Sequence, residues 1–243
     1  MAKLLQQMNP EINLRGSLKM KECSKSIIRR MHEPNFSNRY FVGHGLDIGG
    51  GPDPLGLYIE LFPRMLGVKA WNKEDGDAQT LKDIEDAHYD FVHSSHCLEH
   101  LEDPATGIRN WFRILKPGGH LIITVPDEDM YEQGQFPSTW NGDHKVTFTI
   151  SKSNSWSPKS INIIDLISKL GKELELIKLH KLDESFRYTL PRFDQTLTPI
   201  GECGIEIILR KRTKKEIQDG GRLPSLGIVS KMEALLLTGY QLD

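Results

Sequence analysis

The residues best suited to hold a ligand are the three consecutive glycines at 49–51. Glycine lets a backbone turn sharply and approach a ligand closely. Asp47 stands just before this turn, where a carboxylate suits a cationic or hydroxyl-rich ligand better than a phosphate. Asp53 and Pro54 follow in the pattern of a helix N-cap with proline in the first turn. The segment therefore predicts a strand, a turn and a helix start, the arrangement at which open α/β sheets bind nucleotide-like ligands.

The glycine run does not match the two most familiar phosphate-binding motifs. A dinucleotide fingerprint has a third glycine for close packing of helix on strand, and Pro54 occupies that position. A Walker A loop ends in Gly-Lys-Ser/Thr, which is absent here. A nicotinamide oxidoreductase is therefore a distant alternative, and taken alone the glycine run could equally be a structural turn.

Two later segments continue the same pattern in the expected order. Residues 89–101 predict a strand, a short polar loop and a helix start, and residues 112–126 predict a helix end, a tight turn and a buried strand. With these segments the chain resembles the class I S-adenosylmethionine-dependent methyltransferases. The resemblance spans residues 44–126 and is strongest to the subgroup with the segment Leu98-Glu99-His100 and the turn Leu115-Lys116-Pro117-Gly118-Gly119.

The resemblance implies a Rossmann-like α/β fold. It is a doubly wound, mostly parallel seven-stranded sheet with an antiparallel last strand and helices on both faces. The sequence itself predicts strands at 65–71, 120–125, 174–179 and 204–209, and helices from Asp103 and over 160–170. Asp103 and Pro104 predict the cap and first turn of their helix. We expect a helical lead-in at 1–40, a methyltransferase domain at 41–215 with a substrate loop at about 127–150, and a tail at 216–243 that docks on the domain or pairs two subunits.

The composition of the chain indicates which kinds of binding partner and which cellular compartment to expect. The 243 residues carry a formal net charge of −2, so no overall charge favours nucleic acid, and no run of eighteen apolar residues predicts a membrane span. Three widely spaced cysteines and the lack of a signal-peptide pattern favour a reducing cytoplasm. The basic residues at 19–30 favour a solvated helix face, with a lid over the cofactor as the alternative.

The resemblance also implies which residues hold the cofactor, S-adenosylmethionine. Asp47 matches the family's acid near the methionine portion, where a carboxylate attracts the ammonium or sulfonium charge. The family's ribose-binding acid should follow the strand at 65–71, but Lys69 and Asn72 occupy this region, and Asn72 brings no charge. Asp77 would accept a hydrogen bond from adenine, or else cap a helix. The implied cofactor-binding residues are Asp47, Gly49, Gly50, Gly51, Asn72, Asp77, Ala78, Ser94, Ser95 and His96.

A histidine in the substrate loop is the best candidate for a general base. Methyl transfer depends mainly on alignment, but a hydroxyl acceptor gains from a base whose pKa is near neutral. We expect His144 to be this base with Asp143 orienting its ring, and a loop histidine bonded to backbone is an equally good alternative. Asp127 is the second catalytic candidate. With Glu128 and Asp129 it could bind substrate hydroxyls or a divalent ion, although Glu128 favours a solvated turn.

The stretch His96-Cys97-Leu98-Glu99-His100 also matches a zinc-protease pattern. We disfavour that interpretation because Asp103 and Pro104 interrupt the helix that it needs, and we assign no metal ligands. The sequence therefore predicts a cytoplasmic methyltransferase that acts on a small-molecule or glycan-precursor acceptor, at oxygen rather than nitrogen. The alternatives are an RNA or protein methyltransferase, and a non-catalytic scaffold or regulatory partner.

Overall fold

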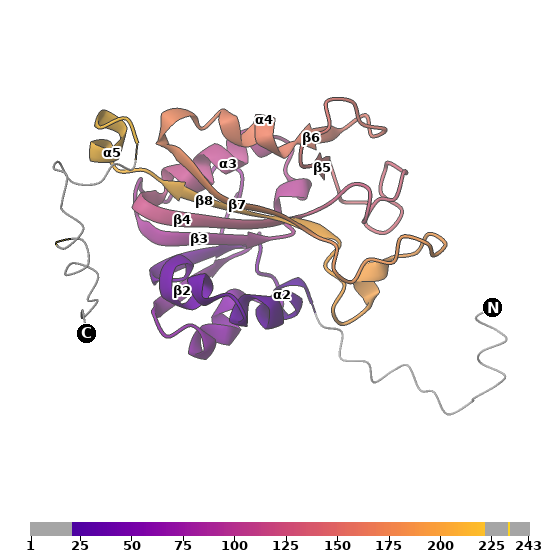
Figure 1. The fold of residues 1–243 in the computed structure, drawn as a ribbon, viewed down its shortest axis with the longest axis horizontal. Helices are drawn as coiled ribbons and strands as arrows, with labels where there is room; N and C mark the ends of the chain where they lie inside the picture. Colours follow the sequence, from indigo (N-terminus) through magenta and orange to yellow (C-terminus); the bar gives the residue numbers. More distant parts are fainter. Residues whose placement is uncertain (1–20, 222–232, 234–243) are drawn as a thin grey trace.

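A six-stranded sheet forms the centre of the molecule (Figure 1). The computed structural model describes residues 21–221 and Glu233. The strand order is β2-β1-β3-β4-β8-β7, in which β1 to β4 run parallel and β8 runs antiparallel to both β4 and β7. These strands are β1 (Gly43–Ile48), β2 (Met65–Trp71), β3 (Tyr89–Ser95), β4 (Leu115–Pro126), β7 (Leu174–Leu182) and β8 (Gly204–Lys211). A separate parallel pair joins β5 (Thr147–Thr149) to β6 (Ser160–Asn162).

Short helices cover both faces of the sheet. The α-helices are α2 (Glu22–Met31), α3 (Pro104–Arg113), α4 (Ile163–Ser168) and α5 (Lys214–Gln218). A π-helix spans Phe36–Tyr40, and 3-10 helices span Leu55–Leu61, Leu98–His100, Gly171–Glu173 and Gln195–Leu197. The expected doubly wound α/β fold with an antiparallel strand is confirmed. Within residues 21–221, however, the central sheet has six strands rather than seven. Residues 72–88 form turns, in which Leu81 and Ala87 have positive φ angles that are incompatible with an extended strand.

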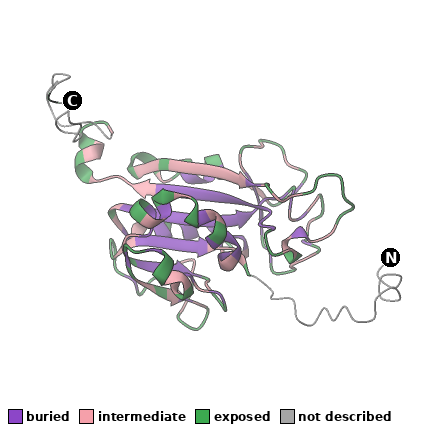
Figure 2. Cartoon of the chain, turned by 60° about the horizontal axis from the view of Figure 1, so that its bottom comes forward, coloured by how far each residue is buried: buried purple, intermediate pink, exposed green. Residues whose placement is uncertain are grey.

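Each face of the sheet has its own apolar core. On one face, Trp111 and Ile108 of α3 and Leu166 of α4 pack against the strands. On the other face, Ile27 of α2 and Phe36 pack with further aromatic side chains. Figure 2 shows the result as buried strands beneath helices whose outer surfaces are exposed. Within the described parts of the chain, no helix is both long and apolar enough to cross a membrane.

The two predicted helix caps have different outcomes. Asp103 caps α3 as expected, since its carboxylate accepts a hydrogen bond from the backbone N–H of Thr106 and Pro104 occupies the first turn. Asp53 does not cap the helix that follows the glycine turn. Its carboxylate accepts instead from the backbone N–H of Ser24, in the first turn of α2, and from the Tyr58 hydroxyl. The glycine turn is thereby tied to α2 across 29 residues of sequence.

The basic residues of α2 do not form the solvated helix face that the sequence favoured. Lys25 and Arg30 are buried and Arg29 is mostly buried, so the solvated-face interpretation is wrong for these three residues. Arg29 and Arg30 reach Glu206 on β8, with nitrogen-to-oxygen distances of 2.9 and 3.3 Å. Lys19 and the other residues before 21 lie outside the described residues, as does most of the expected C-terminal tail.

Candidate active site at the carboxyl edge of the sheet

A cavity of about 180 Å³ lies over the glycine turn, at the carboxyl ends of β1 and β3. This edge of a doubly wound sheet is where such folds bind ligands. The first residues of α2 form the opposite wall. The lining residues are Lys21, Glu22, Cys23, Asp47, Gly49, Gly50, Pro52, Asp53, His93, Ser95 and His96. Of the predicted cofactor-binding residues, Asp47, Gly49, Gly50, Ser95 and His96 therefore meet at one cavity.

Gly49 is required by the shape of the turn. Its φ angle is +76°, and a Cβ atom at this position would lie 2.7 Å from the Cβ atom of Cys97. Gly51 also has a positive φ angle but does not line the cavity. Its backbone N–H donates to the side-chain oxygen of Asn72, at 2.8 Å. Asn72 thus stands at the end of β2, where the ribose-binding acid is expected, and braces the glycine turn.

Asp47 holds the turn and a buried histidine. One carboxylate oxygen lies 2.6 Å from Nδ1 of His93, and the other accepts from the backbone N–H of Leu55 at 2.7 Å. Arg30 lies 3.0 Å from Nε2 of His93. Because arginine can only donate, this Nε2 accepts and Nδ1–H donates to Asp47, so His93 is neutral. Burial lowers the pKa of His93, which agrees with this tautomer.

Two other polar atoms around the cavity have no hydrogen-bond partner in the structure. They are the buried Oε2 of Glu22 and Nε2 of His96, which lie 3.8 Å apart. A free carboxylate oxygen suits the ammonium or sulfonium group of S-adenosylmethionine, and the glycine turn lets the cofactor approach the backbone closely. The residues present therefore fit this cofactor. Sequence reasoning missed Glu22, because it lies in a segment separated from the glycine turn by more than twenty residues.

The remaining predicted cofactor residues lie at other positions around this edge. The exposed Asp77 accepts from the backbone N–H of Gln79 and from the Thr80 hydroxyl, and thereby closes a turn. Ala78 accepts a hydrogen bond from the Trp111 indole through its carbonyl. Ser94 is buried and donates to the carbonyl of Ile48, which ties β3 to β1. None of Asp77, Ala78 and Ser94 lines the cavity.

His144 is buried, and a glutamate orients it. Its Nδ1 lies 2.7 Å from Oε1 of Glu132, whose side chain is also buried. The expectation that Asp143 orients this ring is therefore wrong. The carbonyl of Asp143 lies instead 3.2 Å from Nδ1 of His100. The substrate loop folds back on itself, so Glu132 meets His144 from twelve residues away.

The acids at 127–129 serve the loop itself. Asp127 accepts from the backbone N–H groups of Asp129 and Met130 and lies 3.5 Å from the ammonium of Lys181. Burial raises the pKa of Asp127. Glu128 is fully buried and accepts from Thr147 and from further side chains, so the solvated-turn interpretation is wrong for this residue. Neither acid lines the cavity.

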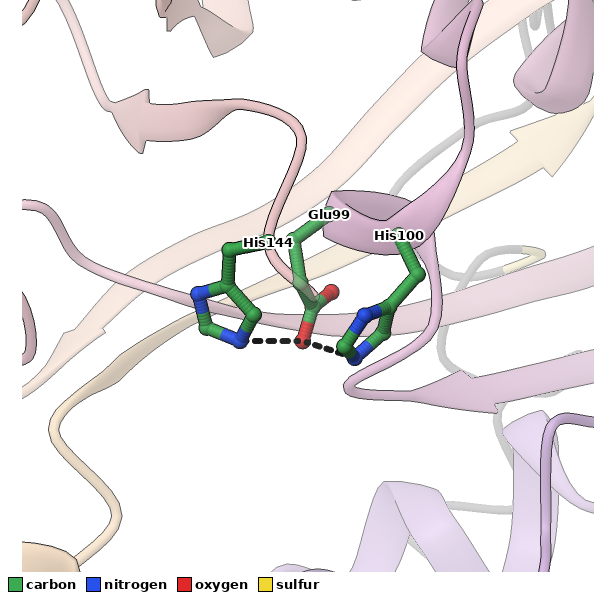
Figure 3. Close-up of side chains that lie close together, drawn as sticks. All are labelled: Glu99, His100 and His144. Carbon is green, nitrogen blue, oxygen red and sulfur yellow. Dashed lines mark ion pairs between the residues drawn. The ribbon is translucent and has the colours of Figure 1, made fainter. Parts of the chain in front are cut away.

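A second carboxylate, that of Glu99, lies beside His144 (Figure 3). Glu99 is fully buried, and its Oε1 lies 4.0 Å from Nε2 of His144 and 3.9 Å from Nε2 of His100. Burial raises the pKa of Glu99 to about 8. The zinc-protease interpretation fails because residues Leu98–His100 form a single 3-10 turn rather than the helix that it needs. The sequence pattern nonetheless contained Glu99 and His100, whose grouping with His144 only the fold reveals.

A second, polar cavity of about 420 Å³ lies beside β6 and α4, around Ser155, Asn162 and Asp165. None of the predicted site residues lines it, so we assign it no part in the chemistry.

Comparisons with known proteins agree with this geometry. A family model described as a methyltransferase domain matches residues 20–162, more than half of the chain. The fold is similar to a candidate methyltransferase from Bacillus halodurans, with a TM-score of 0.50 and 15% identity over 76% of this chain and 99% of that one. A S-adenosylmethionine-dependent methyltransferase from Archaeoglobus fulgidus gives a TM-score of 0.49 and 17% identity over 86% and 99% of the two chains.

One curated relative is similar over a short stretch. It is an uncharacterized 37.1 kDa protein of a Streptomyces fradiae transposon, 39% identical over 66 residues. The match covers 27% of this chain and only 19% of that protein. The family assignment therefore depends on the domain model, together with the glycine turn and its cavity. The chain belongs to the methyltransferase domain family, whose cofactor is S-adenosylmethionine.

Proposed function

We propose that the protein transfers the methyl group of S-adenosylmethionine to a hydroxyl group of a small, sugar-like or similarly hydroxyl-rich acceptor. The observation that supports this most is the buried pair of His144 and Glu132. Glu132 accepts from Nδ1–H of the imidazole, which leaves Nε2 as a proton acceptor. A hydroxyl needs such a group more than an amine does, because a neutral amine already carries a nucleophilic lone pair.

Bound S-adenosylmethionine would supply an electrophilic methyl group, which would move to the acceptor oxygen while the electron pair of the carbon–sulfur bond stays on sulfur. His144 would take the hydroxyl proton on Nε2, and Glu132 would stabilise the imidazolium that results. The segment after β3 connects the cofactor cavity to the surroundings of His144. It carries His96, which lines the cavity, and Glu99, which lies beside His144.

The choice of a small acceptor is supported by what surrounds the site. The net charge of −2 gives no general attraction for RNA. The cavity wall carries the acids Glu22, Asp47 and Asp53 and a single lysine, Lys21, which disfavours a polyanionic acceptor. Methylation of RNA or protein, and a scaffold without catalysis, remain the alternatives that experiment must separate.

The first experiment is a calorimetric titration of ligand-stripped protein with S-adenosylmethionine, S-adenosylhomocysteine and, as a control, NADH. We expect saturable binding of the first two near one equivalent and none of NADH. Failure of folded protein to bind either would contradict the proposed function and favour the scaffold. A screen of hydroxylated acceptors with radiolabelled methyl donor then tests transfer.

Replacing His144 tests its role in transfer. His144→Gln should lower turnover by about 10²–10⁴-fold, the usual contribution of a general base, while the dissociation constant for S-adenosylmethionine stays unchanged. His88→Gln, at an exposed histidine, is the matched control. Near-normal turnover of His144→Gln would remove this residue from the reaction.

A further inference from the structure

Three side chains with metal-binding atoms converge in the loops beside the cofactor cavity (Figure 3). Glu99 and His100 follow β3, and His144 comes from the substrate loop. One atom from each side chain lies within 4.8 Å of the other two. The two imidazole rings stand edge to face, with centroids 5.0 Å apart, so neither ring blocks the other's Nε2.

The buried carboxylate at the centre of this group lacks partners. Glu99 is fully buried, and neither of its oxygens has a hydrogen-bond partner in the structure. Burying a polar carboxyl group without a hydrogen-bond partner costs free energy even when the group is neutral. The ordinary resolution is a hydrogen bond or ion pair, and here the nearest groups are two imidazole nitrogens at 3.9 and 4.0 Å. That spacing leaves room for an atom between them.

Both imidazoles are oriented as metal-binding histidines usually are. Nδ1 of His144 lies 2.7 Å from the Glu132 carboxylate, and Nδ1 of His100 lies 3.2 Å from the carbonyl of Asp143. Each acceptor fixes the proton on Nδ1 and leaves the lone pair of Nε2 facing Glu99. A carboxylate or carbonyl behind the ring in this way orients a metal-binding histidine and raises its basicity.

We propose that Glu99, His100 and His144 together bind one divalent first-row transition cation. Two imidazole nitrogens and one carboxylate oxygen suit zinc, manganese or cobalt, whereas magnesium and calcium prefer oxygen ligands alone. Bonds of about 2.1 Å to a tetrahedral ion place its ligand atoms roughly 3.4 Å apart. The two separations between Glu99 and the imidazole nitrogens, 3.9 and 4.0 Å, need to close by only about half an ångström, and the three ligand atoms all lie within 4.8 Å of one another.

This site would deepen the proposed function, on which its catalytic meaning rests. Three protein ligands leave a zinc-like ion an open position, and an oxygen bound there loses its proton near neutral pH. An acceptor hydroxyl in that position would release its proton to solvent. In the cation-bound protein, Nε2 of His144 would bind the cation, and the role of general base proposed above for this nitrogen would pass to the cation, which lowers the pKa of the bound oxygen.

The test is direct titration of the full-length protein after removal of metals with a chelator. We expect Zn²⁺ to bind with one equivalent by calorimetry, and Co²⁺ to give visible absorption bands that Zn²⁺ abolishes. Mg²⁺ should bind far more weakly. Absence of a stoichiometric Zn²⁺ site in folded protein would overturn the proposal.

Variants locate the site. Glu99→Gln and His144→Gln should each weaken Zn²⁺ binding by at least tenfold, and Glu132→Gln by roughly 10–100-fold, the usual effect of removing a partner behind a metal-binding histidine. Glu102→Gln and His88→Gln alter exposed side chains and serve as controls. Unchanged Zn²⁺ affinity of Glu99→Gln would overturn the proposal.

Two further measurements separate loss of metal binding from misfolding, and the metal proposal from the proposed function. Glu99→Gln removes a buried, unpartnered carboxylate, so in chelator its midpoint of thermal unfolding should equal or exceed that of the unaltered protein, which excludes misfolding as the cause. Titration with S-adenosylmethionine in chelator separates the two proposals. Cofactor binding and methyl transfer that survive metal removal would overturn the catalytic role of the cation and leave the proposed function standing. Stoichiometric Zn²⁺ binding without cofactor binding would do the opposite.

Discussion

Buried polar atoms at the edge of the sheet fall into two groups. Asp47 and His93 have their acceptors and donors satisfied within the protein, by Leu55, Arg30 and each other. Glu22 and Glu99 instead keep buried oxygens that have no hydrogen-bond partner among the described residues. Since an unpartnered buried oxygen is costly, the first group explains how the turn is held and the second marks where ligands can bind.

Gly49→Ala tests the glycine turn at this scale. The substitution places a side chain at φ +76° and within 2.7 Å of Cys97, so we expect destabilisation of about 1–2 kcal/mol from the backbone and a further 1–3 kcal/mol from overpacking. Gly118→Ala is the matched control, because its φ is +89° but nothing lies within 4 Å of the added atom. Chemical unfolding measures both, and only Gly49→Ala should also weaken S-adenosylmethionine binding. Equal behaviour of the two variants would contradict the close-approach argument.

At the level of elements, buried ion pairs to β8 and to Glu202 hold helix α2 in place. Glu206 of β8 is fully buried and lies within 3.3 Å of Arg29, Arg30 and Lys178. Arg29 also pairs with Glu202 at 2.9 Å. These contacts fix one side of the helix to the sheet, while Lys21, Glu22 and Cys23 at its start form a wall of the cavity.

Glu206→Gln should weaken the attachment of α2 to the sheet. Removing the carboxylate leaves two guanidinium groups without their buried partner, which commonly costs about 3–5 kcal/mol of unfolding free energy. Glu184→Gln, whose exposed carboxylate pairs with His180 at the surface, should change it by at most about 1 kcal/mol. Urea unfolding at neutral pH gives both values, and equal values would show that the helix does not depend on this pair.

The same carboxylate predicts how stability varies with pH. Burial alone would raise the pKa of Glu206, but the charges of Arg30, Arg29 and Lys178 lower it to about 2. An unfolded glutamate has a pKa of about 4.3, so the contribution is present above that pH and is lost as pH falls toward 2. Its size is on the order of 3 kcal/mol. Between pH 5 and 2.5 the unaltered protein should therefore lose more stability than Glu206→Gln, and parallel losses would contradict the assignment.

At the scale of the whole molecule, acidic residues balance the positive charge. Among the described residues, Arg210 pairs with Glu175 and Glu216, and Arg29 pairs with Glu202 and Glu206. The formal net charge of −2 gives the chain no overall attraction for a polyanion.

We therefore expect no appreciable RNA binding at physiological salt. Fluorescence anisotropy with a labelled single-stranded RNA should show weak binding with a shallow dependence on salt concentration. A basic single-strand-binding protein measured beside it is the control. Tight retention that falls steeply with salt would support methylation of RNA over a small acceptor.

The sequence predicted what depends on neighbours in the chain. The glycine turn, the cap of α3 by Asp103 and the apolar strand at 120–125 each follow from residues a few positions apart. It could not predict that Arg29 meets Glu206 across 177 residues, so the helix was expected to be solvated. For the same reason we expected Asp143, the acid next to His144 in the chain, to orient its ring. In the structure the substrate loop folds back and Glu132 contacts His144 instead. Only the fold supplies such pairings.

The row of contacts from Glu206 through Arg30 and His93 to Asp47 joins β8 to the glycine turn and to the wall of the cofactor cavity. Thermodynamic reciprocity then applies. Whatever loosens α2 lowers the affinity for the cofactor, and the cofactor tightens α2 by the same factor. Acid that protonates Glu206 should therefore lower the affinity for the cofactor from a distance, in addition to its effect on the acids that line the cavity.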